Sequence, residues 1–103
     1  MRISVRIEDD AAKQFEDLRS WWSRNRPAAR SLKSQLVEAS NRIKEAPYAS
    51  PVYTVLNDIP IRRLLIRRTP YAIYYWVDEA KAEARVIAVW SCQRGEAPPL
   101  RVP

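Results

Sequence analysis

Apolar and polar residues alternate at the beginning of the chain and then adopt a helical period. In residues 2–7 (RISVRI), isoleucine and valine alternate with arginine and serine, which predicts a strand with one solvent-facing side. Asp9 and Asp10 follow, and acidic residues stabilise the first turn of a helix because they interact favourably with its dipole. The pattern therefore predicts a strand that leads directly into a helix.

Two apolar stripes with helical spacing come next. They comprise Ala11, Phe15, Leu18 and Trp22 in the first and Leu32, Leu36, Ala39 and Ile43 in the second. Asn25 can end the first helix, Pro27 fits the first turn of the second, and Pro47 stops it. Two amphipathic helices with a short connection form an antiparallel hairpin, and both stripes are expected to face one core. Trp21 lies off the first stripe, so it either packs at the end of the hairpin or contacts a partner.

The second half of the chain is typical of strands. Residues 48–60 show no clear period, which indicates a connector with a brief extended piece at residues 53–56. Thr69-Pro70 and the polar segment DEAKAEA both predict turns. These turns separate three β-prone runs, at residues 61–68, 71–78 and 84–91.

The order of these elements predicts the fold class. A β-α-α-β-β-β order is typical of an α+β domain, here a single one spanning residues 1–103. Its antiparallel sheet should carry the helical hairpin on one face and leave the other face partly open. The tail after Arg94 is rich in proline, so we expect it to lie extended over the surface.

Positive charge is concentrated in the β-prone half of the chain. The formal net charge is +6, and no acidic residue occurs from Ile59 to Val77. Two arginine doublets fall in this region, Arg62-Arg63 and Arg67-Arg68. Charged side chains on a sheet must face water or a partner, so the doublets predict a recognition surface. Because arginine makes bidentate contacts to carboxylates and phosphates alike, an acidic protein and a nucleic acid are both possible partners.

Three residue types are scarce enough to exclude classes of function. The chain has no histidine, so it has no imidazole base, no histidine-activated nucleophile and, with one cysteine, no zinc site. A single glycine excludes a phosphate-binding loop and a dinucleotide fingerprint. Cys92 lies in a β-prone run, which predicts a buried thiol in a reduced, cytoplasmic protein. We expect no cofactor, no metal and, without a long apolar run, no membrane association.

Four segments occur in a specific order along nearly the whole chain. They are FEDLRSWWSRNRPAA around the helix–helix turn, EAP at the end of the second helix, RRLLIRRTPYAIYYWVD, and VIAVWSCQRG followed by a proline. In this order they resemble the RelE/ParE superfamily of bacterial toxins from type II toxin–antitoxin systems. The resemblance implies a RelE/ParE-like fold and a cognate antitoxin whose C-terminal segment wraps the toxin. In a ParD-like antitoxin the N-terminal domain is a ribbon-helix-helix that binds the operator, so the toxin alone needs no sequence-specific DNA binding. The expected assembly is a hetero-oligomer of toxin and antitoxin.

The superfamily contains two activities. RelE-like members are mRNA endonucleases that act in the ribosome, and ParE-like members poison DNA gyrase. The nuclease pattern has basic residues on the middle strands, and Arg63 and Arg67 occupy such positions. Arg94 matches the basic position of the last strand. Ala72, however, replaces the arginine that nucleases carry after the third-strand tyrosine, and the tail offers Pro98-Pro99-Leu100 where an acid or base is needed.

These departures favour the gyrase-directed activity. Metal-free RNA cleavage requires proton transfer, and an arginine, whose pKa exceeds about 12, is a poor proton shuttle. The sequence therefore predicts a non-enzymatic, ParE-like toxin, with a ribosome-dependent mRNA endonuclease as the alternative. The candidate contacts to target or antitoxin are Trp21, Trp22, Arg62, Arg63, Arg67, Arg68 and Arg94.

A small protein that binds single-stranded nucleic acid is a second alternative. Tyr74, Trp76 and Trp90 could then serve as platforms for base stacking. The same positions suit a sheet face that is covered by the helical hairpin. Burial separates the two interpretations, because stacking platforms must be exposed and core residues must not be.

Overall fold

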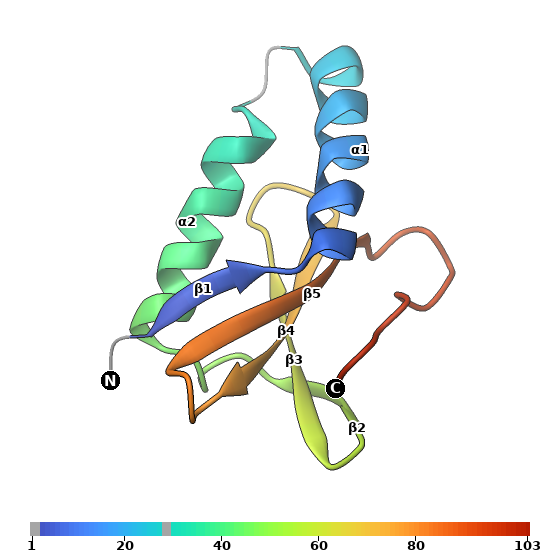
Figure 1. Ribbon diagram of the computed structural model, residues 1–103. Helices are drawn as coiled ribbons and strands as arrows, with labels where there is room; N and C mark the ends of the chain where they lie inside the picture. Colours follow the sequence, from blue (N-terminus) through green and yellow to red (C-terminus); the bar gives the residue numbers. More distant parts are fainter. Residues whose placement is uncertain (1–2, 28–29) are drawn as a thin grey trace.

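The computed structural model describes residues 3–27 and 30–103 of the chain. Position 2 of the predicted first strand and positions 28–29 of the predicted hairpin connection lie outside these residues. The helices and strands are β1 (Ser4–Ile7), α1 (Asp9–Asn25), α2 (Leu32–Glu45), β2 (Val52–Leu56), β3 (Ile59–Leu65), β4 (Tyr71–Asp78) and β5 (Glu83–Ser91). The two helices lie on one face of the sheet, which confirms the predicted α+β arrangement (Figure 1).

The sheet is mixed rather than wholly antiparallel. Within the described residues it contains five strands in the order β1-β5-β4-β3-β2. Strands β2 to β5 pair antiparallel as predicted, whereas β1 pairs parallel with β5, for example Val5 with Ala84. Parallel neighbours require a long crossover connection, and the helical hairpin together with β2–β4 supplies it.

The predicted connector contains a full edge strand. The brief extended piece expected at residues 53–56 is β2, Val52–Leu56, which forms a hairpin with β3. Asn57 and Asp58 make the turn with φ values of 50° and 64°. Two left-handed residues give a hairpin turn the twist of the flanking strands, and asparagine and aspartate tolerate this conformation well. The observed order therefore has one strand more than the predicted order.

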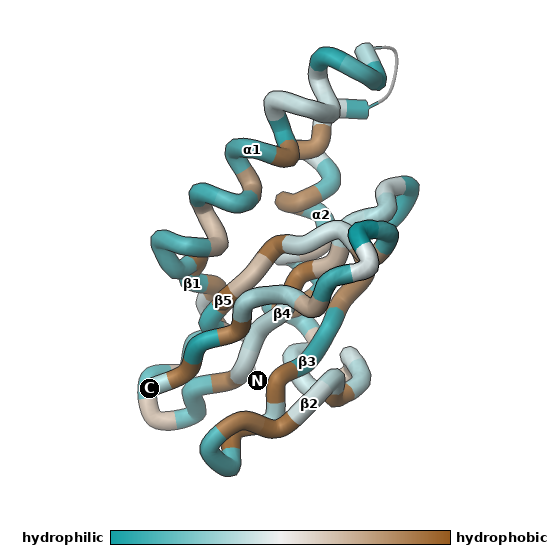
Figure 2. The backbone as a smooth tube through the Cα atoms, turned by 90° about the vertical axis from the view of Figure 1, so that its right-hand side faces the viewer, coloured by the Kyte–Doolittle hydropathy of each residue, from teal (hydrophilic) through white to brown (hydrophobic). Residues whose placement is uncertain are grey.

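Both predicted helical stripes are buried against the sheet. The buried residues are Ala11, Phe15, Leu18 and Trp22 of α1 and Leu32, Leu36, Ala39 and Ile43 of α2. Figure 2 shows the hydrophobic positions of α1 on its side toward the sheet. Helix α2 begins at Leu32, so Pro27 is not in its first turn. Ser31 is the N-cap instead, because its Oγ accepts a hydrogen bond from the Ser34 N–H (3.1 Å).

The sheet has two apolar faces, which we call the helix face and the tail face. On the helix face, Tyr71, Ile73, Tyr75, Val86 and Val89 pack against α1 and α2. On the tail face, a second cluster is covered by Leu100 and Val102 of the tail, residues 92–103, which returns along the sheet (Figure 1). The residues of this cluster are Ile61, Ala72, Tyr74, Ile87 and Ala88, with Trp76 and Trp90 packed against them.

One predicted sheet face and one predicted burial are wrong. Tyr74 is buried, and Trp76 and Trp90 pack against the same apolar cluster, but this cluster lies on the tail face and not under the helical hairpin. On β4, Tyr71 and Tyr75 face the helices, so the alternate residues Tyr74 and Trp76 face the tail. Cys92 is exposed, because β5 ends one residue earlier and Cys92 belongs to the following turn. Neither described helix is long and apolar enough to cross a membrane.

Candidate functional site

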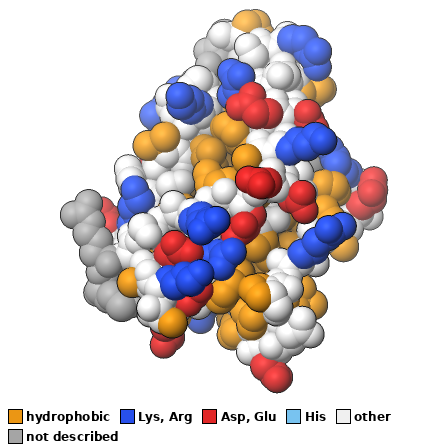
Figure 3. All heavy atoms as spheres, in the orientation of Figure 1, with side chains coloured by type: hydrophobic (Ala, Val, Ile, Leu, Met, Phe, Trp, Pro, Cys, Tyr) orange, Lys and Arg blue, Asp and Glu red, His pale blue; other side chains and the backbone are white. Residues whose placement is uncertain are grey.

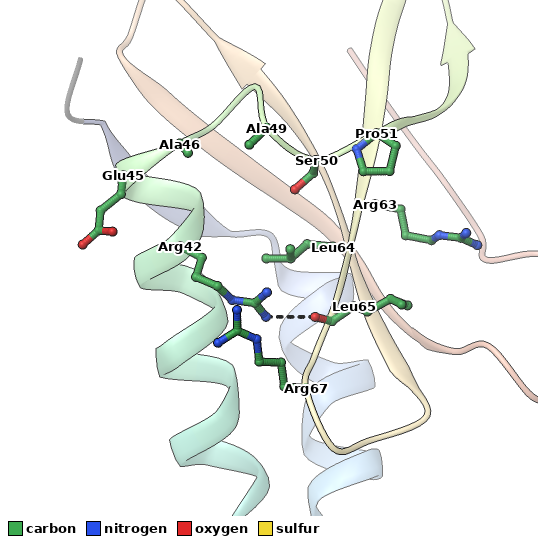
Figure 4. Close-up of a pocket in the computed structure, with 10 residues that line it drawn as sticks. All are labelled: Arg42, Glu45, Ala46, Ala49, Ser50, Pro51, Arg63, Leu64, Leu65 and Arg67. Atoms are coloured by element: carbon green, nitrogen blue, oxygen red, sulfur yellow. Dashed lines mark hydrogen bonds between the residues drawn. The ribbon is translucent and has the colours of Figure 1, made fainter.

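A groove of about 550 Å³ lies between the C-terminal half of α2, the segment that follows it, and β3 (Figure 4). We call it the α2–β3 groove. Its lining combines a mostly apolar wall with charged side chains: Arg42, Glu45, Ala46, Ala49, Ser50, Pro51, Arg63, Leu64, Leu65 and Arg67.

One wall of the groove is an unpaired strand edge. The pairing of β2 with β3 ends at Arg62, and the Arg63 N–H donates to the Pro51 carbonyl just beyond it (3.1 Å). Within the described residues, no strand lies beside Leu64 and Leu65 on this side. The Leu65 carbonyl accepts a hydrogen bond from Arg42 Nη2 (2.9 Å), and the Leu65 side chain is 56% exposed. An open edge with exposed apolar side chains is a template for pairing with another strand.

The guanidinium groups of Arg42 and Arg67 point toward one another at this edge (Figure 4). Burial lowers the pKa of Arg42, the charge of Arg67 lowers it further, and Glu38 partly compensates. Arg42 Nε is buried without a hydrogen-bond partner in the described part of the chain. Arg67 Nη1 lies 3.3 Å from Glu38 Oε1, and Glu38 also lies 3.8 Å from Arg30. Glu38 therefore pairs with Arg30 and Arg67, and its charge also acts on Arg42. Because three arginines depend on one carboxylate, the groove favours a further carboxylate.

The two arginines of the first doublet face opposite sides of the sheet. Arg62 Nη1 donates to the carbonyls of Tyr48 (3.0 Å) and Ser50 (2.7 Å) on the helix side. The Arg63 guanidinium points away from α2 in Figure 4 and lies 5.3 Å from the Tyr53 ring centroid. Arg62 thus ties β3 to the segment after α2, and Arg63 remains at the surface of the tail face.

The remaining candidates occupy other places. Trp22 is in the core, where its Nε1 donates to the Arg30 carbonyl (3.0 Å). Arg68 is exposed in the turn after β3, with φ of 62°. Trp21 is 44% exposed and, with Arg94, lines a separate pocket near the end of α1. The structure therefore brings only Arg63 and Arg67 of the predicted set to the α2–β3 groove, and their guanidinium groups diverge there.

Arg42 and Glu38 are functional candidates that the sequence does not reveal. Each directly precedes a residue of the second apolar stripe, Ile43 and Ala39 respectively, so each lies at the border of the buried face of α2. In the sequence, their position beside the apolar stripe is the signal that could have pointed to these two residues. The sequence gives no indication that β2 stops short and leaves a strand edge beside Arg42.

The positions of the nuclease pattern do not converge on one point. Arg63 lies on the tail face, Arg67 pairs with Glu38 of α2, and Arg94 stacks on the Trp90 ring at 4.4 Å. Ala72 is fully buried within the cluster on the tail face. Elsewhere, the face seen in Figure 3 carries acidic and basic side chains side by side. Among the described residues, these arginines therefore form separate local sites for anions.

The fold matches solved toxins of bacterial toxin–antitoxin systems. The chromosomal ParDE system from P. aeruginosa has a TM-score of 0.67 at 15% identity, covering 87% of this chain and 96% of that chain. The toxin–antitoxin complex RelBE2 from Mycobacterium tuberculosis has a TM-score of 0.63 at 14% identity, covering 88% and 99%. The E. coli toxin RelE in the free state has a TM-score of 0.63 at 18% identity, covering 92% and 88%. At these low identities, the TM-scores show that the fold is shared with these structures, and the fold alone.

The sequence assigns the family within this fold. No curated protein matches the chain. A family model described as the ParE toxin of the type II toxin–antitoxin system parDE matches residues 5–95, and the chain belongs to this family. The resemblance found in the sequence is thereby confirmed.

Proposed function

We propose that this ParE-family toxin inhibits DNA gyrase by binding it, without catalysing a reaction, and that a ParD-like antitoxin neutralises it. The family assignment supports the gyrase target. The divergence of Arg63, Arg67 and Arg94 supports a non-enzymatic action, because a ribonuclease must place a base, an acid and a cation around one phosphate. A RelE-like mRNA endonuclease remains the alternative, since RelE toxins share the fold.

The unpaired edge of β3 carries the proposal for the antitoxin. An extended antitoxin segment can lie along β3 beside Leu65 and place apolar side chains against Leu65 and Pro51. Its acidic residues can then meet Arg42 and Arg67, which share Glu38. The apolar contacts should contribute most of the affinity, and the charges should govern specificity and association rate. The toxin and antitoxin then form a hetero-oligomer.

Neighbouring arginines allow a matched test of this docking site. Arg67 lines the groove, whereas Arg68 is exposed outside it. Arg67→Glu should slow association with the C-terminal peptide of the antitoxin encoded next to the toxin gene by about tenfold at low salt. Arg68→Glu carries the same charge change and should slow it much less. Surface plasmon resonance measures both rates, and equal rates for the two variants would exclude the groove as the docking site.

A further inference from the structure

A second pocket, of about 430 Å³, opens where the end of α1 meets the β3–β4 turn and the segment after β5. We call it the hairpin-end pocket. It shares no residue with the α2–β3 groove. Its basic side chains are Arg24, Arg26 and Arg94, and its acidic side chain is Asp17. The described lining is therefore net positive.

The arginines of this pocket are available for a ligand. Among the described residues, none of the three forms an ion pair or a side-chain hydrogen bond. Arg26 lies 6.0 Å from the Trp22 ring centroid and Arg94 lies 4.4 Å from that of Trp90. A guanidinium above a ring is positioned by the contact but keeps its N–H donors free.

The helix dipole explains only some of the arginines in the hairpin-end pocket. Arg24 lies in the last turn of α1, where a cation interacts favourably with the helix dipole. Arg94 follows β5 and belongs to a different layer of the fold, so the dipole does not explain its presence in the pocket. Two elements that are far apart in sequence thus supply cations to one cavity.

Tyr71 lines the same pocket as Arg26 and Arg94. Burial raises the pKa of its hydroxyl, while the charges of Arg26 and Arg94 both lower it. Because the net shift is upward, the hydroxyl stays protonated at neutral pH and can donate a hydrogen bond. Two guanidinium groups and a hydroxyl donor are a suitable set for a phosphate group.

Trp21 adds a flat apolar surface to the pocket. Its side chain is 44% exposed and lines the pocket. A nucleobase stacks favourably on such a ring, and the stacking is tolerant of base identity. We propose that the hairpin-end pocket binds a nucleotide, with its phosphate at Arg26 and Arg94 and its base on Trp21.

Isothermal titration calorimetry on the full chain tests the site with ADP, pyrophosphate and adenosine. ADP should bind more tightly than either other compound, because it alone carries both phosphate and base. Arg26→Gln and Arg94→Gln should each weaken ADP binding by about tenfold. The matched control Arg6→Gln removes the same charge from an exposed position on β1 and should leave ADP binding unchanged. Thermal unfolding verifies that each variant is folded.

Trp21→Ala tests the base platform separately. It should weaken ADP binding and leave pyrophosphate binding unchanged. A 5′-phosphorylated trinucleotide distinguishes the two sources of the ligand: tighter binding than ADP indicates the end of a nucleic acid, and weaker binding indicates a free nucleotide.

Absence of ADP binding, or equal ADP affinity in the wild type and the Arg26→Gln/Arg94→Gln double variant, would overturn the site. Equal affinity for ADP and pyrophosphate in the wild type would overturn the nucleotide assignment. The site shares no residue with the proposed antitoxin groove, so either can fail without the other.

Discussion

The two faces of the sheet are covered in very different ways. Two amphipathic helices cover the helix face, where Tyr75, Ile43 and Val89 are almost fully buried. An irregular tail covers the tail face, where Trp76 and Trp90 remain half-buried. The tail is held there by its apolar contacts and by a hydrogen bond from Trp90 Nε1 to the Glu96 carbonyl (3.1 Å). The difference indicates that the helix face supplies most of the stability, and the tail face tolerates change.

Neighbouring residues of one strand belong to these different environments. Arg62 is held on the helix side of the sheet by two backbone carbonyls, whereas Arg63 lies on the tail side beside Tyr53. A run of arginines in the sequence therefore does not become one basic surface, because successive side chains of a strand point to opposite faces.

The largest expected difference is in the loss of stability when one leucine on each face is truncated to alanine. Leu36 is buried under α2, and Leu36→Ala should lower the free energy of unfolding by about 2–5 kcal/mol. Leu100 is half-buried on the tail face, and Leu100→Ala should lower it by about 1 kcal/mol or less. Urea unfolding measures both. A loss below about half a kcal/mol for Leu36→Ala, or equal losses for the pair, would contradict the comparison.

The first arginine doublet offers a comparison at adjacent positions. Arg62→Ala removes two hydrogen bonds from a charged donor and should cost about 2 kcal/mol of stability. Arg63→Ala removes a contact with an aromatic ring and should cost well under about 1 kcal/mol. Thermal and urea unfolding of the two variants provide the measurement. If Arg63→Ala were the more destabilising change, the assignment of structural and surface roles would be reversed.

At alkaline pH, tyrosines on the two faces should contribute differently to the free energy of unfolding, and this difference should be smaller than those above. Burial raises the pKa of Tyr75 on the helix face, and Ser50 and Arg62 partly lower it. Burial also raises the pKa of Tyr74 on the tail face, and Arg63 partly lowers it. A tyrosine with a raised folded-state pKa contributes stability below its unfolded pKa of about 10. This contribution is lost as the pH rises through the folded-state pKa.

The free energy of unfolding should therefore decrease as the pH rises above about 10. Tyr75→Phe should flatten this decrease more than Tyr74→Phe, because the Tyr75 hydroxyl donates a buried hydrogen bond to the Pro47 carbonyl (2.7 Å), which ionisation would break. Urea titrations across this range measure the slope. An unchanged slope in Tyr75→Phe would show that other groups cause the pH dependence.

The helical part of the fold could be predicted because its pattern is unambiguous. The stripes containing Leu18 and Leu36 have the period of a helix and one polar side, so both their existence and their orientation follow. Strand β2 was harder to recognise, because the turn Asn57-Asp58 is a weaker hairpin signal than a turn with glycine. The orientation of β4 could not be predicted, because it is apolar on both sides and alternation alone does not tell the two faces apart.

The candidate site could be predicted only in part, for a physical reason. Arg67 was recognisable from local charge, but its neighbours Arg42 and Glu38 come from α2 and meet it through tertiary packing. The open edge at Leu65 arises where β2 stops, which is a long-range property of strand pairing. The hairpin-end pocket likewise depends on Trp21 and Arg94, which lie at opposite ends of the chain.

A direct comparison of the two activities tests the central claim that this toxin acts through binding. Purified toxin should be added to DNA gyrase with relaxed plasmid and, in parallel, to ribosomes translating a defined mRNA. The divergence of Arg63 and Arg67 and the buried Ala72 predict that supercoiling is inhibited while the mRNA stays intact. Addition of the antitoxin should restore supercoiling. Cleavage of the mRNA together with undiminished supercoiling would contradict the account.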